Sequence, residues 1–403
     1  MRYVVLMFLC SIAFVAYVQR TGLNSVAPHI YRDVGIDTEG FAAVGSALLV
    51  GYTLMQVPAG WLADRCGGGK VLAALAIVWS SLTALLGTCT DLASMMLLWF
   101  FMGLALAGIF PCAAKLIGVW FPDTQKAMAS GLLGSSTMFG LAAGSYLTSE
   151  LVFRWDLSWQ RTYLLYGAAG LIWALLFWAL IPMDQGQPRT EQAERTDWPR
   201  LAASAPLWLL CGQQFFRAGA MIFFINWFPS FLHEARGLDL QDAGLWASRV
   251  SIAAMAGGIL GGAFSDWVYR KTGQRRLSRQ GIATTAMTIA AALLLASYLL
   301  AGPLTTVLLL GIAGFVATFG GVSGYTVAIE FGGRRIGTVF SLMNMAGNLG
   351  GAIVNQLVGT LVLRSGTWNT GLLLVAGIFA VDAVCWALLN PKAPLFEESH
   401  EAR

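Results

Sequence analysis

Charged side chains are scarce in this sequence, and their scarcity excludes a water-soluble globular fold. Asp, Glu, Lys and Arg make up only 11% of the 403 residues, whereas 57% are hydrophobic and the mean hydropathy is +0.66. A soluble domain typically carries about 25% charged residues. Apolar runs of about twenty residues recur along the chain, each long enough to cross a hydrocarbon layer of about 30 Å. The composition therefore predicts an all-α membrane protein that crosses the bilayer many times.

Cysteine and histidine are also few, and their spacing excludes a metal centre and a disulfide framework. The six cysteines include no Cys-x-x-Cys pair, and there are only three histidines. The glycine-rich stretch that ends at Lys70 has no Ser or Thr after the lysine, so it is not a phosphate-binding loop. We therefore expect no cofactor, no metal and no enzymatic reaction. The net charge of +4 gives no argument for a nucleic-acid partner, because the cations lie in short segments between apolar runs.

Hydropathy and helix-breaking residues predict twelve membrane-spanning helices in two pseudo-symmetric six-helix bundles. The first run counts as a span because it lacks the small-x-small cleavage site of a signal peptide. We expect an N-terminal bundle at 1–182, a cytoplasmic linker at 183–204, a C-terminal bundle at 205–390 and a cytoplasmic tail at 391–403. The spans are expected near 3–27, 40–63, 70–90, 92–120, 127–152, 160–182, 205–232, 242–267, 280–301, 304–330, 335–362 and 368–390.

Lysine and arginine are unevenly distributed between alternate loops. With the N-terminus inside, most of them fall in cytoplasmic segments, as the positive-inside rule requires. This distribution predicts that both termini are cytoplasmic, and we expect the membrane to be the inner membrane of a bacterium. The outer side receives only Arg32, Arg154, Arg161, Arg236 and Arg364.

The two halves repeat a set of landmarks. Pro28, a Gly-x-Asp turn and Asp64 are matched at nearly equal spacing by Pro229, a second Gly-x-Asp turn and Asp266. Paired six-span halves are typical of transporters, whose site lies between the halves near the bilayer midplane.

The stretch around Asp64 resembles the signature of the major facilitator superfamily, G-x-L-A-D-R-x-G-x-x-K. The resemblance covers the whole chain and implies twelve helices and transport by alternating access. The matching residues are Gly60, Leu62, Ala63, Asp64, Arg65, Gly67 and Lys70, with a weaker echo at Gly262, Ser265, Asp266, Arg270 and Gly273.

Within the superfamily the chain is most similar to the anion:cation symporters, which carry organic acids, and the organophosphate:phosphate antiporters share several of the same features. Proton-coupled members that carry sugar acids have an acid where this chain has Gln19 and another where it has Leu106. The resemblance therefore implies the substrate class and leaves the coupling mechanism open. It rests on Tyr17, Arg20, Tyr52, Phe110-Pro111, Trp120-Phe121-Pro122, Trp227-x-Pro229 and Asn344-x-x-Gly347-Asn348-x-Gly350-Gly351.

Three arginines inside predicted spans are candidate ligands for an anion: Arg20, Arg217 and Arg249. An ionisable side chain at mid-span costs at least about 2.5–3.5 kcal/mol on insertion scales. A guanidinium presents paired donors that match the oxygens of a carboxylate, sulfonate or phosphate. The alternative is a structural ion pair, for which Asp382 is the candidate partner of Arg217 or Arg249.

Uncharged polar residues complete the predicted binding set. Helical spacing places Tyr17 on the same face as Arg20, and a hydroxyl or amide near a bound anion orients it by hydrogen bonds. The alternative is that these groups cross-link helices, as polar residues in membrane spans often do. The candidates are Tyr17, Tyr52, Gln56, Ser135, Asn344 and Asn348.

Charged residues near the cytoplasmic span ends are candidate gate residues. Asp64 is predicted to meet the positive N-terminus of span eleven near Arg335, and Asp266 that of span five near Lys126. Lys115 is expected to reach Asp64, and Glu330 to pair with Arg270 or Arg334. The full gate set is Asp64, Arg65, Lys115, Asp266, Arg270 and Glu330.

The predicted function is secondary transport of a small organic anion, a carboxylate, sugar acid or sulfonate, by a monomer. An efflux carrier for amphipathic compounds and an organophosphate or anion exchanger are the alternatives. A non-transporting receptor would need a sizeable extra domain. Coupling stays open between a proton carried by Asp382 or a histidine, a sodium ion, anion exchange and uniport.

Overall fold

The computed structural model describes residues 1–182, 198–300 and 302–391, and in these ranges the chain forms helices and no strand. Most of the predicted linker, 183–197, and nearly all of the predicted tail, 392–403, lie outside the described residues.

The helices before the linker agree with the first six predicted spans. They are α1 (Arg2–Ser25), α2 (Ala27–Val34), α3 (Thr38–Cys66), α4 (Gly68–Leu85), the short η1 (Leu86–Thr88), α5 (Leu92–Leu106), α6 (Ile109–Trp120), α7 (Lys126–Ser149), the π-helical η2 (Glu150–Arg154) and α8 (Trp159–Leu180).

The helices after the linker agree with the remaining six. They are α9 (Trp198–Ala202), α10 (Ala205–Ile222), the π-helical η3 (Phe223–Trp227), α11 (Phe228–Arg236), α12 (Leu240–Thr272), the π-helical η4 (Arg276–Gly281), α13 (Ile282–Leu299), α14 (Pro303–Gly332), η5 (Gly333–Arg335), α15 (Ile336–Ser365) and α16 (Trp368–Leu388).

Ten stretches of the described chain are long and apolar enough to cross a membrane. One of them, Pro303–Ser365, contains both α14 and α15. α7 is not among the ten, because glycine, serine and threonine replace much of its apolar surface. With α7 included and α14 and α15 counted separately, the described helices supply the twelve crossings of an all-α membrane protein.

The described chain divides into two compact units whose boundaries pass through two helices. Among the described residues, unit 1 comprises 1–120, 136–182 and 335–341, and unit 2 comprises 121–135, 198–300, 302–334 and 342–391. The first turns of α7 therefore belong to unit 2, and the first turns of α15 belong to unit 1. Each unit thus contains the start of a helix whose remainder lies in the other.

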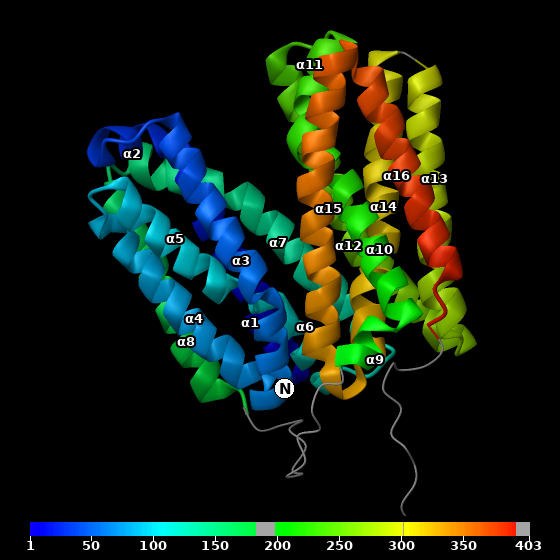
Figure 1. Ribbon diagram of the computed structural model, residues 1–403, viewed down its shortest axis with the longest axis horizontal. Coiled ribbons are helices and arrows are strands. Elements are labelled where there is room, and N and C mark those ends of the chain that lie inside the picture. Colours follow the sequence, from blue (N-terminus) through cyan, green and yellow to red (C-terminus); the bar gives the residue numbers. More distant parts are fainter. Residues whose placement is uncertain (183–197, 301, 392–403) are drawn as a thin grey trace, which may run out of the picture. The chain divides into compact units, whose positions relative to one another are not determined.

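Glycines allow the helices of unit 1 to pack closely. α3 packs against α5, and α4 against α8 (Figure 1). A Cβ added at Gly51 would collide with the carbonyl oxygen of Phe100, and one at Gly103 with that of Leu48. Because neither backbone can move away, a side chain at either glycine would separate α3 from α5.

Close helix packing at glycines recurs in unit 2. α12 packs against α14, and α13 contacts both α14 and α16 (Figure 1). A Cβ at Gly257 would meet the carbonyl of Phe315, and one at Gly261 that of Phe319. α15 lies along α10, where a Cβ at Gly350 would collide with the backbone of Phe215.

The repeated Gly-x-Asp turn has the same structure in both halves. Gly35 ends α2 and Gly237 ends α11, each in the left-handed conformation with φ of 70° and 68°. Two residues later Asp37 and Asp239 cap the next helix, their carboxylates accepting from backbone N–H groups at 2.8 and 2.7 Å. The turn ends a short helix and starts a long one.

Candidate functional site

The carboxylate of Asp64, at the end of α3, caps the first turn of α15 within unit 1. It accepts hydrogen bonds from the backbone N–H of Gly337 at 2.9 Å and from the N–H and hydroxyl of Thr338, both at 2.8 Å. The Nζ of Lys115, in α6, lies 3.1 Å from the same carboxylate. Both predicted contacts of Asp64, with the start of span eleven and with Lys115, are confirmed.

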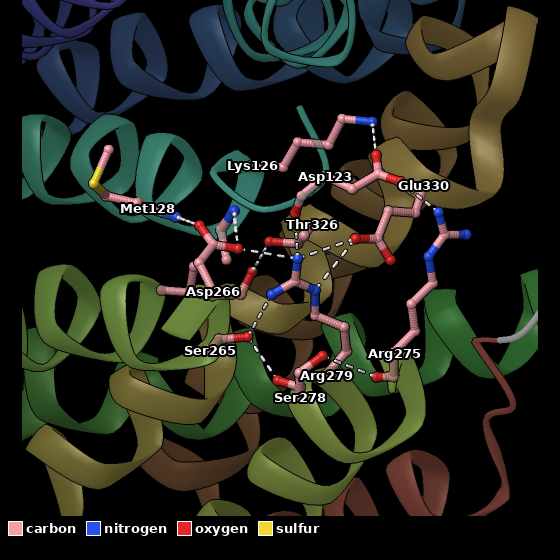
Figure 2. Close-up of polar contacts among 12 residues, drawn as sticks. Asp123, Lys126, Met128, Ser265, Asp266, Arg275, Ser278, Arg279, Thr326 and Glu330 are labelled. Carbon is pink, nitrogen blue, oxygen red and sulfur yellow. Dashed lines mark hydrogen bonds and ion pairs between the residues drawn. The ribbon is translucent and has the colours of Figure 1, made fainter. Parts of the chain in front are cut away.

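Asp266 makes the equivalent contact within unit 2. Its two oxygens accept from the backbone N–H groups of Ala127 at 3.3 Å and Met128 at 2.8 Å, at the start of α7 (Figure 2). A carboxylate at this position also opposes the positive end of the helix dipole. The predicted contact of Asp266 with the start of span five is likewise confirmed.

Arg279, in η4, is the central residue of a polar cluster around Asp266. The sequence pattern does not identify it as a site residue. Its side chain is fully buried and forms ion pairs with Asp266 at 3.0 Å and with Glu330 at 3.2 Å. It also donates to the hydroxyl of Ser265 at 2.7 Å and to the carbonyl of Asp123 at 2.9 Å (Figure 2). Its position directly before predicted span nine indicates only a cytoplasmic cation.

Three predicted gate residues lie elsewhere than expected. The carboxylate of Glu330 pairs with Arg279, whereas Arg270 is exposed and forms no ion pair with the described residues. Arg65 is also exposed, with its guanidinium 5.2 Å from the ring centre of Trp61. Arg65 does not share the environment of Asp64, because consecutive residues in a helix lie about 100° apart around its axis.

Asp123 lies between α6 and α7, in a loop that the sequence predicts to be cytoplasmic. It connects the cluster around Arg279 to charged residues of the cytoplasmic loops. Lys126 lies 2.6 Å from its carboxylate, and Arg275 donates to its other oxygen. Burial disfavours the ionised form, but the hydrogen bond and charge of Lys126, together with Arg275, outweigh it. They hold the pKa of the Asp123 carboxyl below its ordinary value.

Asp123→Asn is expected to remove a pH dependence from the stability of the protein. A lowered pKa in the folded state stabilises the fold above the unfolded-state pKa of about 3.9, and this contribution is lost as the pH falls through the folded-state value. The parent should melt at a higher temperature than the variant at neutral pH, and the difference should shrink as the pH falls below about 4 and vanish below the folded-state pKa. Melting curves in detergent across this range test it, and a constant difference contradicts it.

In unit 1, Arg20 is half-buried in α1 and stands apart from acids. Its guanidinium carbon lies 5.9 Å from the ring centre of Tyr17, whose ring meets Phe110 edge-on at 6.4 Å. No carboxylate in the described part of the chain forms an ion pair with Arg20. In α3, Tyr52 is half-buried and Gln56 is fully buried.

Gln19, where related symporters carry an acid, is part of the core of unit 1. Its amide oxygen accepts from the indole N–H of Trp79 at 2.7 Å, and its amide nitrogen donates to the carbonyl of Tyr166 at 2.8 Å. The hydroxyl of Tyr163 donates to the backbone carbonyl of Gln19 at 3.1 Å. The residue links α1 to α4 and α8, and an amide does not titrate, so Gln19 carries no proton.

In unit 2, Arg217 lies between α10 and α14. It donates to the side-chain oxygen of Gln214 at 2.9 Å, and its guanidinium carbon is 5.8 Å from the ring centre of Tyr325. The side chain passes Gly321, where an added Cβ would come within 2.8 Å of it. Like Arg20, Arg217 forms no ion pair with a described acid, although the charge of Arg217 acts on Asp382.

The remaining candidates of unit 2 differ in environment. Arg249 is exposed, with its guanidinium carbon 4.5 Å from the ring centre of Trp246. Ser135 donates to the carbonyl of Met255 at 3.0 Å, so its hydroxyl cross-links α7 to α12. Asn344 is buried in α15, whereas Asn348, one turn later, is exposed.

Sequence comparison identifies a family and several relatives. The profile of the Major Facilitator Superfamily matches residues 9–355. A probable sulfoacetate transporter of Cupriavidus necator is 26% identical, over 97% of this chain and 94% of its own length. A probable galactarate/D-glucarate transporter of Escherichia coli is 27% identical, over 96% of this chain and 94% of its own length.

Structure comparison finds the same fold in solved proteins. A crystal structure of the E. coli fucose:proton symporter superposes with a TM-score of 0.77. The match covers 96% of this chain and 99% of the symporter at 17% sequence identity. Similarity at that identity establishes the fold of the described helices and nothing further about their chemistry.

Proposed function

The chain belongs to the Major Facilitator Superfamily, and on that premise we propose that it is a secondary transporter of small organic anions that works by alternating access. The family and the relatives above are transporters rather than enzymes. The relatives named for sulfoacetate and for galactarate or D-glucarate support a sulfonate or a sugar acid as the substrate class.

The observation that carries the proposal is a pair of cations inside the membrane without a carboxylate partner. Arg20 contacts the ring of Tyr17, and Arg217 contacts Gln214 and Tyr325, but neither forms an ion pair with an acid of the described chain. A charge in a membrane span is costly unless it is neutralised or solvated. An anionic substrate supplies the missing negative charge.

The uncharged candidates divide into ligands and helix links. We propose Tyr17 and Tyr52 of unit 1 and Asn344 and Asn348 of unit 2 as groups that orient the substrate. Ser135 leaves this set because its hydroxyl is used to link two helices. Arg249 is retained only as an attractant for anions, because it is exposed.

We propose that the two carboxylate caps form and break during the transport cycle. Asp64 with Lys115 and Asp266 with Arg279 each hold the first turn of a long helix. A contact of this kind stabilises one conformation and is lost in another, which is the requirement for a gate. Their repetition in both halves supports a symmetric role.

The topology is proposed from the distribution of cations. Lysine and arginine are concentrated in the segments that share a side with the N-terminus, and this supports cytoplasmic termini in the inner membrane of a bacterium. We propose that a monomer is the working unit, with a proton or sodium gradient as the driving force.

The direct test is uptake by purified protein in proteoliposomes, with labelled sulfoacetate and labelled galactarate as probes. At least one probe should enter, and unlabelled anions of the same class should compete with it. The neutral sugar alcohol galactitol is the matched control and should neither enter nor compete. Transport of neutral or cationic compounds with no uptake of either anion would show that the substrate class is wrong.

A further inference from the structure

Asp382, in α16, is a buried carboxylate without a hydrogen bond. Its side chain is fully buried, and neither oxygen has a hydrogen-bond partner among residues 1–182, 198–300 and 302–391. Three carboxylates nearer the ends of long helices, Asp64, Asp266 and Glu330, all accept hydrogen bonds. An ionised carboxylate without partners is very costly in an apolar interior. In this conformation Asp382 is therefore expected to carry a proton.

One cation acts on Asp382 from a neighbouring helix. α10 packs against α16, and the positive charge of Arg217 on α10 acts on the carboxyl group without forming an ion pair with it. α13, the other long helix packed against α16, contains no Asp, Glu, Lys, Arg or His, and its tyrosine, Tyr298, lies in its last turn.

The remaining titratable groups near α16 are thiols or already have partners. Cys385 on α16 and Cys211 on α10 are the neighbouring thiols, and neither supplies a positive charge. In η4, Arg279 is paired with two carboxylates, and Arg276 is exposed and bonded to Gln280. Arg217 is thus the cation available to an ionised Asp382.

Two more buried polar groups near Asp382 have no partner in the described chain and could be paired in a second arrangement of this region. Arg217 uses one terminal nitrogen to hold Gln214, but its buried Nε has no hydrogen-bond partner. The indole N–H of Trp386, one turn after Asp382 and on the same face, is also buried without one. Unsatisfied buried groups of this kind are rare in a resting core and call for a functional explanation.

We propose that Asp382 is the proton carrier of this transporter, and that its carboxylate and the transported anion compete for Arg217; the proposal rests on the function proposed above. While the anion occupies Arg217, Asp382 keeps its proton. When the anion leaves, the O–H bond of Asp382 breaks, the proton passes to water, and the carboxylate pairs with the guanidinium.

This competition couples the two fluxes. With anion and proton bound, Arg217 has one negative partner, and with both absent it again has one, the carboxylate of Asp382. Either mixed form leaves an uncompensated charge, which is unfavourable in the membrane interior. Each anion therefore moves with one proton in the same direction, and no acid at Gln19 or Leu106 is needed.

The test compares Asp382→Asn with the parent and with Cys385→Ala, a neighbouring change on the same helix that leaves the carboxyl intact. Sulfoacetate and galactarate are the probes in proteoliposomes. Parent and control should accumulate the probe when the lumen is alkaline, whereas Asp382→Asn should exchange labelled for unlabelled probe with an accumulation ratio of one. Accumulation by Asp382→Asn equal to that of the parent would overturn the proposal.

If Asp382→Asn loses exchange as well as accumulation, Asp382→Glu is the variant that tests the proposal. Because it restores an acid, it should recover accumulation driven by the pH gradient, and failure to recover it counts against the proposal. In the parent, the dissociation constant should also rise by up to about tenfold per pH unit once Asp382 ionises and competes. Asp382→Asn should lack this dependence.

A readout without substrate separates this proposal from the proposed function. Without substrate, the infrared difference spectrum of the parent between acidic and neutral pH should contain the C=O stretch of a protonated, buried carboxylic acid, and that of Asp382→Asn should lack it. Absence of that band overturns the proton-carrier role, whichever probe the parent transports. Failure of the parent to carry either probe, with the band present, would instead contradict only the substrate class.

Discussion

Asp64→Asn is expected to lower the free energy of unfolding by about 3–5 kcal/mol, because it breaks a buried ion pair by removing one partner. Lys115 is only 8% exposed and would keep its charge without a counter-ion. The asparagine also replaces an acceptor that holds the N–H groups of Gly337 and Thr338. Denaturant titration in detergent measures the loss, and transport assays should show a larger effect on turnover than on anion affinity.

The matched control is the double variant Asp64→Asn, Lys115→Met. Removing the cation as well removes the uncompensated charge, so the double variant should be more stable than the sum of the single changes implies. The interaction free energy should be about 0.5–3 kcal/mol. Strictly additive effects would show that the contact at 3.1 Å contributes nothing.

Arg279→Leu is expected to destabilise the protein by about 3–5 kcal/mol, because two buried carboxylates, Asp266 and Glu330, lose their ion pairs with Arg279. The arginine also binds the hydroxyl of Ser265 and the carbonyl of Asp123, and both acceptors would lose a donor. Arg279→Lys should rescue only part of the loss, because an ammonium cannot reproduce the planar fork of a guanidinium.

Arg276→Leu provides the comparison for Arg279→Leu. It removes the same charge from the same η4 segment, but Arg276 is exposed and its side chain donates a hydrogen bond to Gln280, with no ion pair among the described residues. A surface change of this kind usually stays within about 0.5 kcal/mol of the parent. Equal melting temperatures for the two leucine variants would show that the buried network is not what stabilises this part of the protein.

The fold was accessible from the sequence because its strongest signals are local. Apolar runs of membrane length, and turns in which a glycine ends one helix and an aspartate starts the next, locate the spans to within a few residues. The contacts of Asp64 and Asp266 with distant helix starts were also predictable. Each carboxylate recurs at the same place in its half, and a helix N-terminus is a general partner for negative charge.

The partners of Glu330 and Gln19 were not accessible, because they depend on packing between distant segments. Arg279 reaches Glu330 because η4 is a π-helical turn that buries the arginine, and hydropathy marks only the boundary there. Gln19 was recognised as a missing acid, but its hydrogen bonds to Trp79 and Tyr166 require the packing of three helices.

The anion-binding role of Arg20 is tested most directly by the dissociation constant of the transported anion, measured for the parent and for Arg20→Gln. Arg2→Gln is the control, because Arg2 lies at the chain start with its guanidinium 5.1 Å from the ring centre of Tyr3. Loss of a charge-assisted hydrogen bond of about 1.5–3 kcal/mol should weaken binding roughly ten- to hundredfold in Arg20→Gln and leave Arg2→Gln unchanged. An unchanged dissociation constant in Arg20→Gln would contradict the account.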